Sequence, residues 1–125
     1  MSREGQEQSR SARPHERLDA WKISMALALD VYRVTKSFPR EETYGLTSQV
    51  RRAAASVPAN LAEGSARKGN QETRQFFYIA RGSLSELETY LTLSLGLAYL
   101  SEEAYSGLMK TSGRVSALLN GLIKD

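Results

Sequence analysis

The sequence predicts an all-α protein, an up-down-up-down antiparallel four-helix bundle with a flexible N-terminal tail. Apolar residues recur at intervals of three and four along four segments, the period of a helix with one buried face. No segment alternates apolar and polar residues for long enough to make a strand. The connections between the four segments are short, and short connections favour antiparallel neighbours.

The 125-residue chain is long enough for one core. Residues 1–16 are polar and contain Pro14, so we predict a disordered tail there and one bundle domain over residues 17–125. The absence of cysteine excludes disulfides and thiolate metal sites. The first seventeen residues lack the apolar stretch of a signal peptide, and the longest nearly apolar run, residues 93–100, is too short to span a bilayer. We expect a cytoplasmic protein without a membrane partner.

The first helix is predicted from a stripe that ends before Pro39: Leu18, Trp21, Met25, Ala28, Tyr32 and Thr35. The second helix should begin near Thr43 or Thr47 and run to about Ala66, because glycine and asparagine follow within residues 67–70. Pro58 lies inside this helix, although a proline in a helix interior costs about 3 kcal/mol.

A third helix is predicted over residues 71–100, with a core stripe of Phe77, Ala80, Leu84, Leu87, Leu91, Leu95 and Ala98. Ser101 precedes Glu102 and Glu103, which predicts an N-cap and an acidic first turn for the fourth helix. The apolar stripe of that helix is Leu108, Val115, Leu118, Leu119 and Leu122.

The second and third helices carry more apolar surface than one core needs. An alanine face (Ala55, Ala59 and Ala62) lies apart from the core face of the second helix. The third helix has a second stripe, namely Phe76, Ile79, Ser83, Glu86, Tyr90, Leu93, Leu97 and Leu100. This surplus predicts a homo-oligomer; the alternative is a wide core face in a monomer.

The second helix also carries a polar seam. At 100° per residue, its members fall within an arc of about 80°: Gln49, Arg52, Ser56, Asn60, Glu63 and Arg67. Arg52 and Glu63 are about 16 Å apart along the axis, too far to pair in one straight helix. Because an unpaired buried charge is costly, we predict that Arg52 pairs with Glu86 of the third helix. The seam and Glu86 would fix helix register, form an oligomer interface or bind a ligand.

Positive charge is concentrated in one part of the chain. Residues 51–81 contain six basic and two acidic residues, a surplus of four. The candidate nucleic-acid-binding residues lie at and after the predicted turn: Arg67, Lys68, Arg74 and Arg81. No element suited to reading bases is present, so any RNA or DNA binding should be driven by the phosphate backbone and weakly specific. The alternative is a solvated basic face.

Motifs that carry chemistry are missing from the sequence. The single histidine, His15, lies in the predicted tail, and there is neither a Glu-x-x-His pair nor a glycine-rich phosphate loop before a helix. Glu63, Glu86 and Glu88 could form a carboxylate cluster, but no motif specifies one. We therefore predict that the protein is not an enzyme, with no catalytic residue, metal or cofactor.

Two stretches, YRVTKSFPREETYGLTSQVRRAAASVPANLAEG (residues 32–64) and IARGSLSELETYL (residues 79–91), resemble a known family. This family comprises four-helix-bundle proteins encoded in intervening sequences of bacterial large-subunit rRNA genes, sometimes labelled ribosomal proteins. The resemblance covers about residues 17–124. It implies a homopentamer and places these residues in its two signatures: Gln49, Arg51, Arg52, Ser56, Asn60, Glu63 and Gly64 in the first, and Ser83, Glu86 and Glu88 in the second.

The resemblance brings no established biochemical activity. The family is also similar in fold to the accessory variability proteins of diversity-generating retroelements, basic pentamers that bind a reverse transcriptase and nucleic acid. A reverse transcriptase is therefore a partner only by distant analogy. We predict a non-catalytic oligomeric accessory protein that binds RNA or DNA with low specificity; the alternative is a protein-interaction scaffold with no nucleic-acid role.

Overall fold

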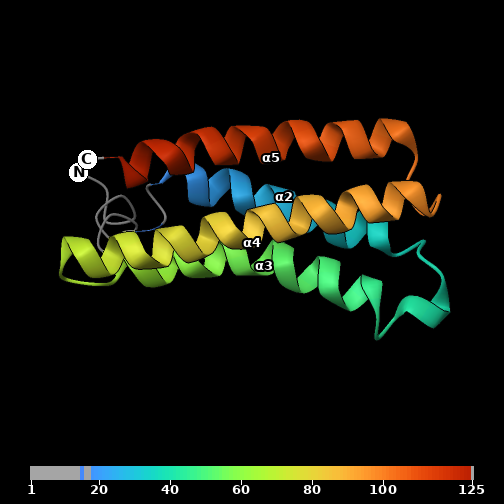
Figure 1. Ribbon diagram of the computed structural model, residues 1–125, viewed down its shortest axis with the longest axis horizontal. Helices are drawn as coiled ribbons and strands as arrows, with labels where there is room; N and C mark the ends of the chain where they lie inside the picture. The colour runs from blue at the N-terminus through green and yellow to red at the C-terminus, as the bar shows by residue number, and fades with distance from the viewer. Residues whose placement is uncertain (1–14, 16–17, 125) are drawn as a thin grey trace, which may run out of the picture.

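The computed structural model describes His15 and residues 18–124, so the predicted tail lies, apart from His15, outside the described residues (Figure 1). Four long helices form the bundle: α2 (Asp19–Thr35), α3 (Leu46–Ser65), α4 (Asn70–Gly96) and α5 (Glu102–Ile123). A single 3-10 turn, η2 (Arg40–Glu42), lies between α2 and α3. No strand occurs in the described part of the chain, and the predicted all-α fold is confirmed.

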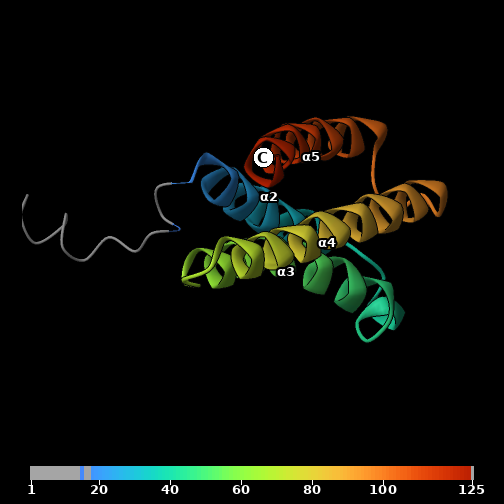
Figure 2. The ribbon, with the colours of Figure 1, turned by 60° about the vertical axis from the view of Figure 1, so that its left-hand side comes forward.

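The four helices surround one core. α3 contacts α2 and α4, and α5 contacts the same two helices, so α3 and α5 lie on opposite sides of the bundle (Figures 1 and 2). The turn between α3 and α4, the start of α2 and the end of α5 lie at one end (Figure 1). The core contains these fully buried aliphatic residues: Leu27, Val31, Val50, Val57, Leu61, Leu87, Leu91, Val115 and Leu119. None of the helices within residues 18–124 combines the length and hydropathy needed to cross a membrane.

Helix α4 ends four residues earlier than predicted, at Gly96. Ala98 adopts a left-handed conformation with φ of 63°. Its N–H bonds to the Leu95 carbonyl at 2.9 Å, and the Tyr99 N–H bonds to the Ser94 carbonyl at 2.9 Å. These two hydrogen bonds form a Schellman motif, which satisfies carbonyls left free at a helix end. The predicted N-cap of α5 is confirmed, because the Ser101 hydroxyl accepts a hydrogen bond from the Ala104 N–H at 3.0 Å.

Glu42 connects the two loops at the opposite end of the bundle. Its Oε1 accepts a hydrogen bond from the Leu46 N–H at 3.1 Å, at the start of α3. Its Oε2 accepts one from the Tyr99 hydroxyl at 3.0 Å, and the Tyr99 ring lies 5.5 Å from the ring of buried Phe38. The carboxylate therefore ties the α2–α3 connection to the α4–α5 connection.

This contact predicts a loss of stability at alkaline pH. The hydrogen bond to Glu42 raises the pKa of Tyr99 above its ordinary value of 10.0, and desolvation and the negative charges of Glu42 and Glu41 add to the effect. A group whose pKa is raised by folding stabilises the protein fully below its unfolded pKa and loses that contribution as pH rises through the folded pKa. The free energy of unfolding, measured with urea at neutral pH and above pH 10, should fall more at the higher pH for the unmutated protein than for Tyr99→Phe. Equal losses would contradict the assignment.

Candidate interaction surfaces

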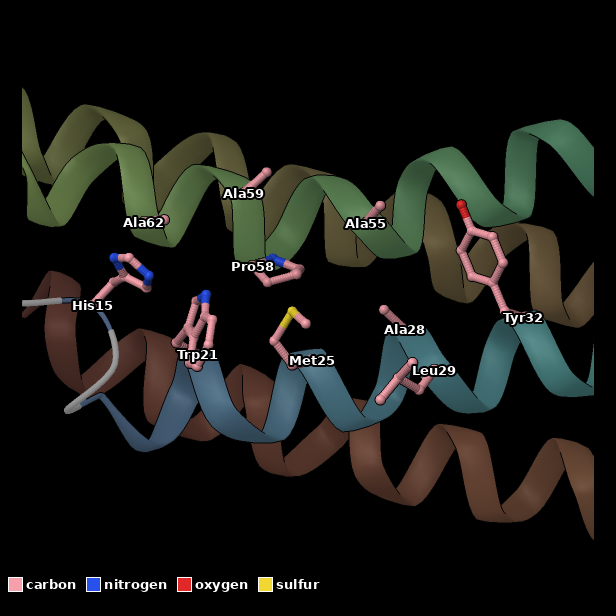
Figure 3. A pocket seen from close by; sticks show the side chains of 10 residues that line it. All are labelled: His15, Trp21, Met25, Ala28, Leu29, Tyr32, Ala55, Pro58, Ala59 and Ala62. Carbon is pink, nitrogen blue, oxygen red and sulfur yellow. The ribbon is translucent and has the colours of Figure 1, made fainter. Parts of the chain in front are cut away.

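An apolar groove with a volume of about 530 Å³ runs between α2 and α3 (Figure 3). We call it the α2/α3 groove, and its lining residues are His15, Trp21, Met25, Ala28, Leu29, Tyr32, Ala55, Pro58, Ala59 and Ala62. The side of the groove formed by α3 carries short alanine side chains, and we call it the floor; the side formed by α2 carries larger side chains, and we call it the wall (Figure 3). The ring of Pro58 belongs to this floor, which gives the proline within α3 a packing role (Figure 3).

Part of the core stripe predicted for α2 lines the groove instead of the core. The predicted core stripe is confirmed at Ala28 and Thr35, which are buried, and Trp21 is partly buried against the core. It is wrong at Met25 and Tyr32, which are 37% and 43% exposed. Leu27 and Val31 occupy the core instead. Apolar residues lie around much of α2, so the spacing of three and four is compatible with burial of either of two faces of the helix. His15, expected in the tail, packs its ring edge-on against Trp21, with 4.9 Å between the ring centroids.

A second apolar surface is exposed on α4. Ile79, Leu93 and Leu97 are each 47% to 50% exposed, and Glu86, also exposed, lies between them along the helix. We call these four residues the α4 stripe. They share one line of the helix because they are spaced by seven, seven and four residues. The prediction of apolar surface beyond the core holds for these positions, whereas Ser83 and Leu100 of the predicted stripe are buried.

The predicted polar seam is divided between a helix junction and solvent. The hydroxyls of Ser56 on α3 and Ser83 on α4 are 2.8 Å apart. The Asn60 amide donates to the Ser56 carbonyl at 2.8 Å and to its hydroxyl at 2.9 Å. The contact between Ser56 and Ser83 joins α3 to α4, and Asn60 bonds to Ser56 within α3. The other seam residues Gln49, Arg52 and Glu63 are exposed.

The ion pair predicted between Arg52 and Glu86 within one chain is not formed. Both side chains are exposed, and neither has a hydrogen bond or ion pair to another residue in the described part of the chain. The prediction assumed a buried seam, and exposure removes the penalty that would have required a partner. On α4, Ser83 contacts the middle of the seam at Ser56, and Glu72 lies 3.5 Å from Arg67 at the end of the seam.

The four basic candidates are not gathered into one free patch. Arg67 pairs with Glu63 and lies 3.5 Å from Glu72, and its guanidinium lies 4.9 Å from the centre of the Phe76 ring. Arg81 donates to the Asn120 side chain of α5 at 3.2 Å. Lys68 is exposed at the turn and Arg74 is partly buried in the first turns of α4. Intramolecular contacts therefore engage much of the predicted basic surface.

Arg51 has a role that its charge alone did not indicate. Its Nε donates to the Thr35 hydroxyl at 2.8 Å, and its Nη2 donates to the Tyr32 carbonyl at 3.3 Å. The guanidinium also lies 4.7 Å from the centre of the Tyr32 ring. Arg51 thus holds the end of α2 against α3 and positions one end of the α2/α3 groove. No sequence motif marks such a contact between helices.

The described residues offer no group of three or more acidic or histidine side chains placed to hold a metal ion.

Comparisons with known proteins agree with this architecture. The family model of the 23S rRNA-intervening sequence protein matches residues 16–121. A crystal structure of a protein of unknown function from the S23 ribosomal protein family of Bacteroides thetaiotaomicron is similar, with a TM-score of 0.79. That match covers 85% of this chain and 99% of the other at 21% identity, so it shows the fold alone. None of the curated proteins matches the sequence. The family match covers α2, α3 and α4 and all but the last two residues of α5, and the chain belongs to the family of 23S rRNA-intervening sequence proteins.

Proposed function

We propose that the protein is a non-catalytic homo-oligomer that acts as an accessory factor and binds RNA or DNA with low specificity. The observation that carries the assembly is the presence of two exposed apolar surfaces, the α2/α3 groove and the α4 stripe. Soluble monomers rarely expose extended apolar patches, and such patches commonly mark protein interfaces. Covering both surfaces with other copies of the chain would remove them from water.

The positions of the two surfaces favour a ring. Ser83, which contacts α3, lies about 40° around α4 from Ile79, whereas Glu88, which bonds to Ser112 of α5, lies about 180° from Ile79. The α4 stripe therefore belongs to the α3 side of α4, and the groove lies on the adjacent side of the bundle. A contact between two different surfaces is heterologous and forms a ring when its rotation closes. A small ring, such as the pentamer that the family resemblance implies, fits this arrangement.

Nucleic-acid binding is supported by the charge distribution. The surplus of four positive charges in residues 51–81 includes Arg67 and Lys68 at the turn between α3 and α4. In a ring this turn would repeat around one rim, so weak phosphate contacts would add. Glu63 and Glu72 partly neutralise Arg67, which limits what each subunit contributes. The same pairing favours the second candidate function, a protein-interaction scaffold without a nucleic-acid role.

Charge reversal at the turn should separate the two functions. Arg67→Glu combined with Lys68→Glu is expected to abolish binding to an RNA hairpin and to duplex DNA at low salt, because the rim would repel phosphates. Lys110→Glu with Arg114→Glu makes the same charge change at exposed positions of α5 and should retain most of the binding. Fluorescence anisotropy across a salt series measures both, and the binding should weaken steeply as salt rises. If the intact oligomer binds no RNA or DNA at low salt, nucleic-acid binding is contradicted and the protein-interaction scaffold remains as the function.

A further inference from the structure

We infer that the α2/α3 groove of one copy receives the α4 stripe of the next copy, and that Arg52 of the first copy pairs with Glu86 of the second. The inference rests on the proposed assembly and identifies the contact that would build it. Three properties of the chain support it: the shapes of the two surfaces, their charges, and the polar composition of residues 2–14, the other segment considered as an occupant of the groove.

The shapes of the two surfaces match. The floor of the groove consists of short side chains, Ala55, Ala59 and Ala62, which allow close approach of another helix. Between Trp21 and Tyr32 the groove extends about 16 Å along α2, at 1.5 Å per residue. The α4 stripe extends about 27 Å from Ile79 to Leu97 by the same measure, so it can cover the groove along its whole length.

The charges are complementary at the same contact. Glu86 lies in the middle of the exposed apolar stripe, and Arg52 lies about 20° around α3 from Ala59, beside the floor of the groove. Neither side chain has a partner in the described part of the chain. Docking the stripe into the groove of another copy brings the carboxylate toward the guanidinium, and opposite charges across a contact fix partner and register.

A segment of the same chain is a poor occupant of the groove. Residues 2–14 contain no large apolar side chain; they are serine, arginine, glutamate, glutamine, glycine, alanine and proline. An apolar groove gains little from such a sequence, because the main driving force for docking is burial of apolar surface. The α4 stripe, with Ile79, Leu93 and Leu97 about half exposed, offers that surface.

Blocking each surface separately tests the contact. Ala59→Trp fills the groove and Leu93→Asp places a charge in the stripe; both positions are exposed, so both variants should fold, as circular dichroism would verify. Each variant alone should be monomeric by light scattering. An equimolar mixture should form a complex of two copies, since one intact groove and one intact stripe remain. Ala117→Trp, at an exposed position of α5, should keep the unmutated mass.

Charge reversal tests the pair. Arg52→Glu and Glu86→Arg should each weaken assembly by roughly a hundredfold or more, because like charges would meet at every contact. Mixing the two variants should restore contacts between unlike copies, which a pair within one chain would not do. Rescue by the double variant without rescue by mixing would contradict a contact between copies.

The outcomes distinguish this contact from the assembly on which it rests. A monomeric unmutated protein would overturn the proposed assembly and this inference together. An unmutated oligomer whose mass survives both Ala59→Trp and Leu93→Asp would overturn only the contact, and would be the result expected if the groove held a small molecule instead.

Discussion

Replacing Leu87 with alanine is expected to lower the free energy of unfolding by about 2–5 kcal/mol. Leu87 is fully buried on α4, a helix that packs against both α3 and α5. Truncation removes its transfer free energy and leaves a cavity that neighbouring helices can fill only in part. Urea unfolding at fixed protein concentration would measure the loss, because the stability of an oligomer depends on concentration.

Leu122 provides the matched control for Leu87. It lies near the end of α5, away from both proposed interfaces, and is 36% exposed. Leu122→Ala should lower the free energy of unfolding by less than about 1 kcal/mol, since a partly hydrated site loses less on truncation. Equal losses at the two leucines would contradict the assignment of the core.

Adding one methyl group at Gly64 is expected to destabilise the protein by about 1–3 kcal/mol. A β-carbon at Gly64 would lie 2.9 Å from Phe77 Cε1 and 3.0 Å from Phe76 Cβ. Phe77 is buried, so α3 and α4 would have to move apart near the turn that joins them. Gly64 therefore permits the close approach of these two helices, which accounts physically for a glycine in the last turns of α3.

Gly113→Ala makes the same chemical change where there is space. A β-carbon at Gly113 would meet nothing within 4 Å, and the residue is exposed within α5. Alanine in an exposed helix is more favourable than glycine by about 0.5–1 kcal/mol, so this variant should be more stable than the unmutated protein. Urea unfolding measures the free energy of unfolding of both variants. If it changes in the same direction for Gly64→Ala and Gly113→Ala, close packing against Phe76 and Phe77 does not determine the effect at Gly64.

Much of the fold could be predicted from local signals. The four helices follow from the three-and-four spacing of apolar residues, and Ser101 marks the start of α5 as an N-cap should. The face that α2 buries could be predicted only in part, because Met25 and Tyr32 fit the helical period as well as Leu27 and Val31 do. Which apolar face enters the core depends on the volumes that the other three helices leave, and periodicity does not contain that information.

The candidate surfaces were predictable only in part. The alanines of α3 and the second stripe of α4 indicated surplus apolar surface, but the groove was missed because its wall on α2 had been assigned to the core. Arg52 and Glu86 were expected to be buried together, whereas Ser56 and Ser83 form the junction and both charges stay outside. The contact of Glu42 with Tyr99 joins residues 57 positions apart, and no local pattern predicts it.

The mass of the unmutated protein in solution tests the central claim most directly. Multi-angle light scattering at micromolar concentration should give a multiple of the 13.9 kDa chain that stays constant on dilution, about 70 kDa if five copies close the ring. Constancy is expected because a closed ring has no free interface from which subunits add or leave one at a time. A mass of 13.9 kDa throughout would contradict the account.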